Sequence, residues 1–247
     1  MLKLVILPGL DGTTTLLRDF MDAARPTFDS VMAVAYPCDC LLSFDELERI
    51  ARDALPKVGS FVLLGESFSG PIALSIAANP PAGLAGLVLS TTFANSPVSM
   101  LRPFAGLARF APVHSLPISL LSWCLLGRWA TPQLISALSG ALHSVAASVL
   151  RSRASMALRV DVTACLSRIT VPVLYLQATK DRLLRPGASK VILQGIPRTT
   201  LTRVAGPHLL LQAAPTRVAD AVATFVSELE QEAKSHSVPQ FGSNHAA

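Results

Sequence analysis

The chain has 247 residues, of which 51% are hydrophobic and 15% are charged, and its formal net charge is +5. This length suits one α/β domain with an insertion and is long enough for a sizeable core. No basic helix is interleaved with exposed aromatic residues, which argues against nucleic acid as a partner. The four cysteines form no Cys-x-x-Cys pair, and no histidine lies at metal-ligand spacing. We therefore expect free thiols, no metal, no cofactor and a reducing, cytoplasmic setting.

Two apolar stretches require a test for membrane insertion. Residues 110–127 and 129–150 contain no Lys, Arg, Asp or Glu, and both are long enough to cross a bilayer. Both contain proline and histidine, and the second adds several serines, so insertion is costly and a membrane span is not expected. The N-terminal apolar run has only four residues before Pro8, which is too short for a signal peptide.

The first half of the chain predicts alternating strands and helices. Residues 2–7 form a short buried strand that leads into the loop Pro8-Gly9-Leu10-Asp11-Gly12. A second strand spans residues 31–35, and Ser43 with Glu46 forms a capping box that begins a helix ending near residue 55. Gly and Thr after the first strand suit a wide turn whose backbone N–H groups face a cavity.

The third predicted strand runs into a serine at a sharp turn. Phe61–Leu64 is followed by Gly65-Glu66-Ser67-Phe68-Ser69 and then by an Ala-rich helix that ends at Ala78. Such a turn lifts the serine hydroxyl to the mouth of a cleft, where the amides of the following helix favour negative charge. This is the geometry of a nucleophilic serine, although small residues alone would also pack a helix on a strand.

The second half interrupts the alternation and then resumes it. After a strand at residues 84–89, the segment 96–165 reads as several helices marked by prolines, with six arginines and one acid, Asp161. Strands at 171–176 and 201–205 follow, and an amphipathic helix spans 214–232. The pattern predicts an α/β fold with a mostly parallel sheet and helices on both faces. The predicted organisation is a core of residues 1–95 and 166–234, a helical insertion of residues 96–165 and a disordered tail of residues 235–247.

Four segments occur in an order that resembles the α/β-hydrolases of the lipase and esterase type, up to about residue 232. Residues 7–12 are similar to the oxyanion loop, with Pro8 where a histidine often stands. Residues 65–70 resemble the nucleophile elbow, with Ser69 where the family pattern has glycine. Residues 176–181 and 205–208 match the turns that carry the acid and the base, in the chain order Ser, Asp, His. The first predicted strand corresponds to the family's third strand. The resemblance therefore does not predict which strand forms the edge of the sheet.

The resemblance implies a role for each matching residue. Ser67 would attack an ester carbonyl, His208 would take and return the proton, and Asp181 would orient the imidazole. The backbone N–H groups of Leu10 and Phe68 would hold the oxyanion. Asp161 is the reserve acid.

The expected function is therefore a serine carboxylesterase that forms an acyl-enzyme on a small-molecule ester. The alternatives are an acyltransferase or thioesterase on the same triad, or a non-catalytic ligand-binding protein of this fold. The insertion falls where the family places its lid, whose apolar residues would line an acyl pocket; the candidates are Leu120, Leu121, Trp123, Leu125, Leu126 and Trp129.

The arginines of the insertion have two interpretations. They solvate an apolar subdomain, or they form a basic patch for an acidic partner such as an acyl carrier protein, for a substrate carboxylate or for a phosphopantetheine arm. The second reading follows from a resemblance to pimeloyl-acyl-carrier-protein methyl ester esterases, and its candidate residues are Arg151, Arg153 and Arg159.

Overall fold

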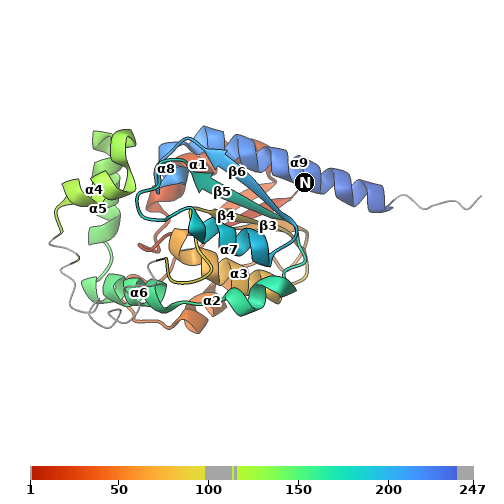
Figure 1. The fold of residues 1–247 in the computed structure, drawn as a ribbon, viewed down its shortest axis with the longest axis horizontal. Helices are drawn as coiled ribbons and strands as arrows, with labels where there is room; N and C mark the ends of the chain where they lie inside the picture. The colour runs from red at the N-terminus through yellow and green to blue at the C-terminus, as the bar shows by residue number, and fades with distance from the viewer. Residues whose placement is uncertain (1, 98–112, 114–115, 238–247) are drawn as a thin grey trace, which may run out of the picture.

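A single parallel sheet of six strands forms the centre of the molecule (Figure 1). The computed structural model describes residues 2–97, 113 and 116–237. The strand order is β2-β1-β3-β4-β5-β6, and every neighbouring pair is parallel. The strands are β1 (Lys3–Leu7), β2 (Ser30–Ala33), β3 (Phe61–Glu66), β4 (Leu84–Ser90), β5 (Val173–Ala178) and β6 (Thr199–Val204).

Helices cover both faces of this sheet (Figure 1). One face carries α2, α3 and α7, and the other carries α1 and α9. The helices are α1 (Arg18–Ala24), α2 (Phe44–Asp53), α3 (Gly70–Ala78), α4 (Ile118–Leu125), α5 (Pro132–His143), α6 (Ala147–Arg159), α7 (Gly187–Gly195), α8 (Leu210–Ala213) and α9 (Pro215–Ser237).

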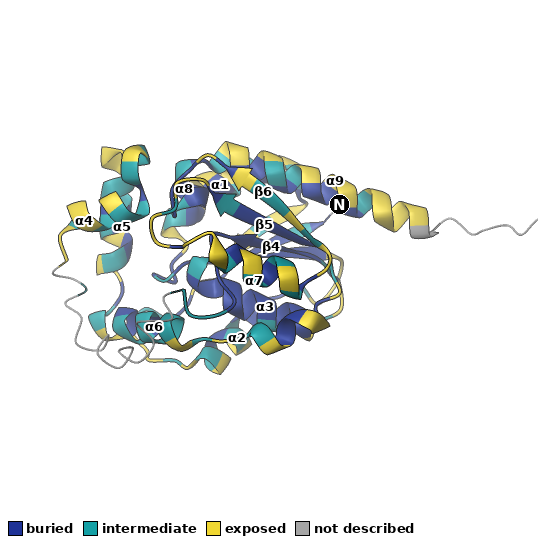
Figure 2. Ribbon diagram, viewed as in Figure 1, coloured by how far each residue is buried: buried dark blue, intermediate teal, exposed yellow. Residues whose placement is uncertain are grey.

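The central strands are buried on both faces, which explains why they are apolar without alternation (Figure 2). In β1, Val5 packs in the core beneath α2 and α3, whereas Ile6 packs in the core beneath α1 and α9. Successive side chains of a strand point to opposite faces, so one apolar run supplies both cores. The fold class expected from the sequence is confirmed.

Most predicted elements lie within about two residues of their observed bounds, and the capping box of α2 is present. The Glu46 N–H bonds to the Ser43 hydroxyl, and the Glu46 carboxylate accepts from the Ser43 N–H. Helices α7 and α8 were not predicted. The predicted disordered tail is wrong for residues 235–237, because α9 continues through this Ala- and Lys-containing end to Ser237. Residues 238–247 lie outside the described part of the chain.

The predicted insertion contains α4, α5 and α6, between β4 and β5. Residues 98–112, 114 and 115 of this segment lie outside the described residues. In the described part of the chain, no single helix is long and apolar enough to cross a bilayer. Helices α5 and α6 meet the length and composition criteria only together, with a bend of 99° between them. Whether the insertion acts as a lid stays a prediction.

Candidate active site

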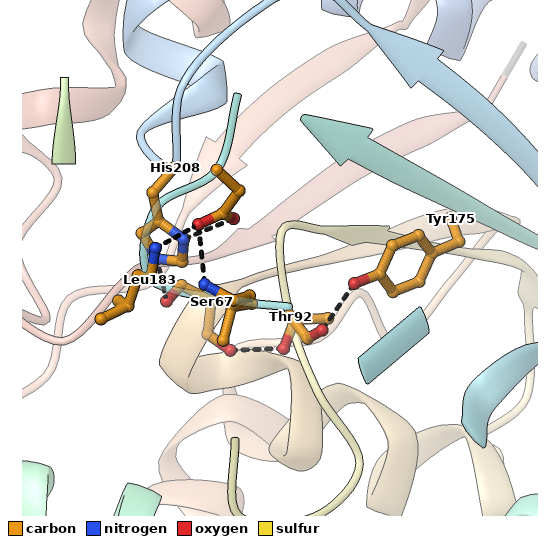
Figure 3. A network of polar contacts seen from close by, with 7 residues as sticks. Ser67, Thr92, Tyr175, Leu183 and His208 are labelled. Atoms are coloured by element: carbon orange, nitrogen blue, oxygen red, sulfur yellow. Dashed lines mark hydrogen bonds and ion pairs between the residues drawn. The ribbon is translucent and has the colours of Figure 1, made fainter. Parts of the chain in front are cut away.

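Ser67 occupies a strained turn between β3 and α3. Its φ is 45°, in the left-handed region that costs a non-glycine residue about 1–2 kcal/mol. Gly65 permits the close approach of strand and helix, because a Cβ on it would lie 2.7 Å from the Ala73 Cβ. The turn is also tied to β4: the Thr92 hydroxyl donates to the Ser67 carbonyl at 2.5 Å, and the Tyr175 hydroxyl donates to the Thr92 carbonyl at 2.6 Å (Figure 3). The backbone thus holds the Ser67 side chain in one direction.

The structure brings Ser67, His208 and Asp181 into one hydrogen-bonded series. The Ser67 Oγ lies 2.9 Å from the His208 Nε2 (Figure 3), and the His208 Nδ1 lies 2.9 Å from the Asp181 Oδ2. The other Asp181 oxygen, Oδ1, accepts from the N–H groups of Leu183 and Leu184, at 2.8 Å each. The side chains of His208 and Asp181 are 3% and 9% exposed. A carboxylate fixed on both oxygens can hold the imidazole in the tautomer that leaves Nε2 free to accept the serine proton.

Parallel strands explain why three distant residues meet. Ser67, Asp181 and His208 follow β3, β5 and β6, and the carboxyl ends of parallel strands share one edge of a sheet. Backbone bonds join the last two loops, since the Thr179 N–H donates to the Val204 carbonyl and the Lys180 N–H donates to the Gly206 carbonyl. The loops of the acid and the base are therefore held as one unit.

The loop after β1 is tied to the elbow by a residue that departs from the family pattern. Ser69 is fully buried, and its hydroxyl donates to the carbonyl of Pro8. The Tyr36 hydroxyl lies 3.2 Å from the Ser69 Oγ. Leu10 and Phe68 belong to these two loops, which follow the neighbouring strands β1 and β3. Their role as oxyanion donors stays a prediction. The importance of Ser69 was missed, because a glycine motif gives no reason to expect a hydroxyl there.

Arg153 is not available to a partner, so its assignment to a surface patch is wrong. It is 2% exposed, and it projects from α6 into the first loop. Its Nη1 donates to the carbonyls of Leu10 at 3.1 Å and Asp11 at 2.6 Å, and its Nη2 donates to the carbonyl of Pro37 at 2.9 Å. Gly12 must lack a side chain, because a Cβ there would lie 2.3 Å from the Arg153 Nη1. Burial lowers the pKa of Arg153, and the carbonyl dipoles offset its lost hydration.

The other two candidate arginines line a groove that Ser67, His208 and Asp181 do not line. Arg151 is half-buried and Arg159 is exposed. Both line a groove of about 630 Å³ on α6, together with Asp161 and apolar residues such as Phe44 and Met156. No triad residue lines this groove. Their role in binding a partner or substrate stays a prediction.

Two further carboxylates lie near the elbow, and both are buried. Glu66 accepts from the Gln212 Nε2 at 2.9 Å, and burial raises its pKa to about 7. Asp11 accepts from the N–H and hydroxyl of Thr13, and burial raises the pKa of Asp11. Asp161 instead accepts from the N–H and hydroxyl of Thr163, and the carboxylate that contacts His208 is that of Asp181. Among the described residues, no group of three or more His, Cys, Asp or Glu side chains could hold a metal ion.

Segment α4 of the insertion contacts the loops of both the acid and the base. The Leu209 N–H, next to His208, donates to the Leu125 carbonyl at 3.1 Å, and the Arg182 Nη1, next to Asp181, donates to the Trp123 carbonyl at 2.5 Å. Leu126 is buried, whereas Leu120 and Trp123 are exposed. The exposed pair therefore faces solvent and does not line a closed acyl pocket.

Comparison with known proteins supports the architecture. No protein-family profile matches the sequence, and no curated protein is significantly similar to it. A hydrolase from Oleispira antarctica aligns over 92% of this chain and 91% of its own, with a TM-score of 0.78 and 15% identity. A thermophilic esterase from Thermogutta terrifontis aligns over 93% and 90%, with a TM-score of 0.74 and 19% identity. A bromoperoxidase from Bacillus anthracis aligns over 92% of both chains, with a TM-score of 0.79 and 11% identity. These likenesses establish the fold, and the reaction must be argued from the site.

Proposed function

The chain has the α/β-hydrolase fold, and on that premise we propose that it is a serine hydrolase that cleaves carboxylic esters through an acyl-enzyme. The observation that carries the proposal is the series Ser67–His208–Asp181, with both donor–acceptor distances at 2.9 Å. A buried base in contact with the hydroxyl, oriented by a fixed carboxylate, is what an unactivated serine needs to become a nucleophile.

The chemistry proceeds in two halves. The Ser67 Oγ bonds to the ester carbonyl carbon while the His208 Nε2 takes its proton, and the N–H groups of Leu10 and Phe68 receive the negative oxygen. The carbon–oxygen bond to the alcohol then breaks, and His208 returns the proton to the leaving alcohol. Water repeats the sequence on the acyl-serine and releases the carboxylic acid. Asp181 stabilises the imidazolium in both halves without taking its proton.

The substrate class we propose is a small or medium acyl ester, with an ester linked to an acidic carrier protein as a special case. The carrier version now rests on Arg151 and Arg159 and on the net charge of +5. Arg153 no longer supports the carrier version, because its buried side chain donates hydrogen bonds to backbone carbonyls of the same chain.

The test combines turnover with covalent labelling. We expect hydrolysis of p-nitrophenyl esters from acetate to decanoate and labelling of Ser67 by a fluorophosphonate. Ser67→Ala should lose both, with kcat lower by about 10⁴-fold or more. Ser75→Ala, on the adjoining helix α3, is the matched control and should keep both. Labelling without ester hydrolysis would redirect the proposal to thioesters or acyl transfer. An unlabelled wild type would end the proposal of a catalytic serine.

A further inference from the structure

An exposed apolar surface lies on α4 and on the loop that carries Asp181. Among the described residues, seven large hydrophobic side chains are exposed, and four of these lie here. Trp123 is 59% exposed and Leu120 is 52% exposed. Figure 2 shows exposed residues on α4, at the end of the molecule opposite the free end of α9. We call this surface, together with the cations described next, the α4 patch; its residues are Leu116, Leu120, Trp123, Arg128, Lys180, Arg182 and Leu183.

Cations border the apolar side chains, and two of them stack on indole rings. The guanidinium carbon of Arg182 lies 4.5 Å from the centroid of the Trp123 ring, and that of Arg128 lies 4.3 Å from the centroid of the Trp129 ring. Such stacking holds an arginine in place without neutralising its charge. Arg128, Lys180 and Arg182 all line a cavity of about 310 Å³.

The cavity keeps an excess of positive charge. Among the residues that the structure describes, Asp181 is the only acidic one that lines it. The Asp181 carboxylate already accepts from His208 and from the N–H groups of Leu183 and Leu184. The three cations of the α4 patch thus outnumber the one carboxylate beside them, and an anionic partner would complement this charge.

We propose that the α4 patch binds the surface of an anionic phospholipid bilayer. Leucine and tryptophan side chains at the boundary of headgroups and acyl chains gain from apolar burial, while lysine and arginine attract anionic headgroups. Tryptophan prefers this boundary because its ring is apolar and its N–H is polar. A soluble anion would contact the cations alone. An anionic lipid surface would contact the cations and also bury the exposed leucines, so the α4 patch favours the lipid surface.

The contacts of α4 with the loops of Asp181 and His208 would place a bound bilayer close to the candidate active site. Leu125 bonds to the residue after His208, and Trp123 bonds to the residue after Asp181. A bound bilayer would therefore lie beside the loops of the acid and the base. The binding proposal does not depend on the chemistry of Ser67, and either proposal can fail alone.

The two tryptophans of the chain, Trp123 and Trp129, make the α4 patch visible by intrinsic fluorescence. The probes are vesicles of phosphatidylcholine alone and vesicles of phosphatidylcholine mixed with phosphatidylglycerol. We expect the wild type to co-sediment with the mixed vesicles and its emission to shift to shorter wavelength. Binding to the neutral vesicles should be at least about tenfold weaker, and salt should weaken binding to the mixed ones. In Trp129→Phe, the shift should persist and report on Trp123 alone.

Two patch variants and two matched controls decide the outcome. Leu120→Ser and Arg128→Glu should each weaken binding to the mixed vesicles by about fivefold or more. Val58→Ser and Lys57→Glu make the same types of change at exposed positions before β3 and should bind like the wild type. Circular dichroism and urea unfolding check that each variant is folded. Absence of co-sedimentation, equal binding to both kinds of vesicle, or patch variants that bind like the controls would overturn the proposal. Binding to an acidic protein without binding to the mixed vesicles would also overturn the proposal.

Discussion

At the scale of single residues, the turn that carries Ser67 is strained. Ser67 has a φ of 45°, and its carbonyl is fixed by the Thr92 hydroxyl. Glycine adopts a positive φ without a Cβ penalty. We therefore expect Ser67→Gly to unfold with a free energy about 1 kcal/mol higher than that of Ser67→Ala.

Urea unfolding of the two variants measures this difference. Both lack the hydroxyl, so the loss of the hydrogen bond to His208 is the same in each. Equal stabilities, or a less stable glycine variant, would show that the turn is not strained in the folded chain.

Ser69 supplies a second prediction at this scale. Its hydroxyl connects the elbow to the Pro8 carbonyl, two residues before Leu10, whose N–H is the predicted oxyanion donor. In Ser69→Ala, we expect kcat to fall by about 10- to 100-fold while KM stays nearly constant, because the loop loses its position rather than its affinity for substrate. Ester kinetics measure kcat and KM separately, and labelling of Ser67 reports whether the serine stays reactive. A rise in KM alone, or unchanged kcat, would assign Ser69 to packing only.

At the scale of elements, α6 supports the first loop from outside the sheet. Arg153 donates to three backbone carbonyls, two of them in the loop of Leu10. Removal of a buried donor leaves its acceptors unpaired, at a cost of about 1–3 kcal/mol for each group. The helical insertion thus contributes to the geometry of the predicted oxyanion donors as well as to the surface.

We expect Arg153→Met to lower the free energy of unfolding by about 3–5 kcal/mol and to lower kcat with it. Arg153→Lys keeps the charge but cannot donate as a fork, so it should recover part of the stability and little of kcat. Arg159→Met, on the exposed face of the same helix, is the control and should match the wild type on small esters. Urea unfolding and ester kinetics make the comparison. The expectation would be contradicted if Arg159→Met were destabilised while Arg153→Met kept the stability and kcat of the wild type.

At the scale of the whole molecule, the buried carboxylate of Glu66 makes stability depend on pH. Burial raises its pKa to about 7, from an ordinary value of 4.5. Between these values the folded chain keeps a proton that the unfolded chain releases, so stability falls as pH rises from about 4.5 to about 7 and stays lower above. The raised pKa of Asp11 acts with the same sign.

Glu66→Gln removes the ionisation of Glu66 and leaves that of Asp11. We expect the variant to match the wild type near pH 4 and to be more stable by roughly 3 kcal/mol near pH 8. Urea unfolding at the two pH values measures the change. Parallel stability curves for the two proteins would show that Glu66 is not the group that titrates.

The pattern of apolar residues predicted the strands, and the motifs predicted the order of the loops and the candidate triad. Apolar runs such as Leu4–Leu7 and Phe61–Leu64 must be buried on both faces, and parallel strands place their following loops at one edge. Because Ser67, Asp181 and His208 each follow such a strand, their places in the chain predicted that they would lie at the same edge.

The direction of long side chains, in contrast, could not be predicted before the packing of the helices was known. The sequence does not distinguish among Arg151, Arg153 and Arg159. In the structure, α6 directs Arg153 inward, where it donates to three carbonyls, and leaves Arg159 exposed. Helix α7 and the bond from Ser69 to Pro8 likewise depend on neighbours distant in the chain. Local sequence carries periodicity and turn chemistry, whereas the partner of a buried polar group is set by what the fold places beside it.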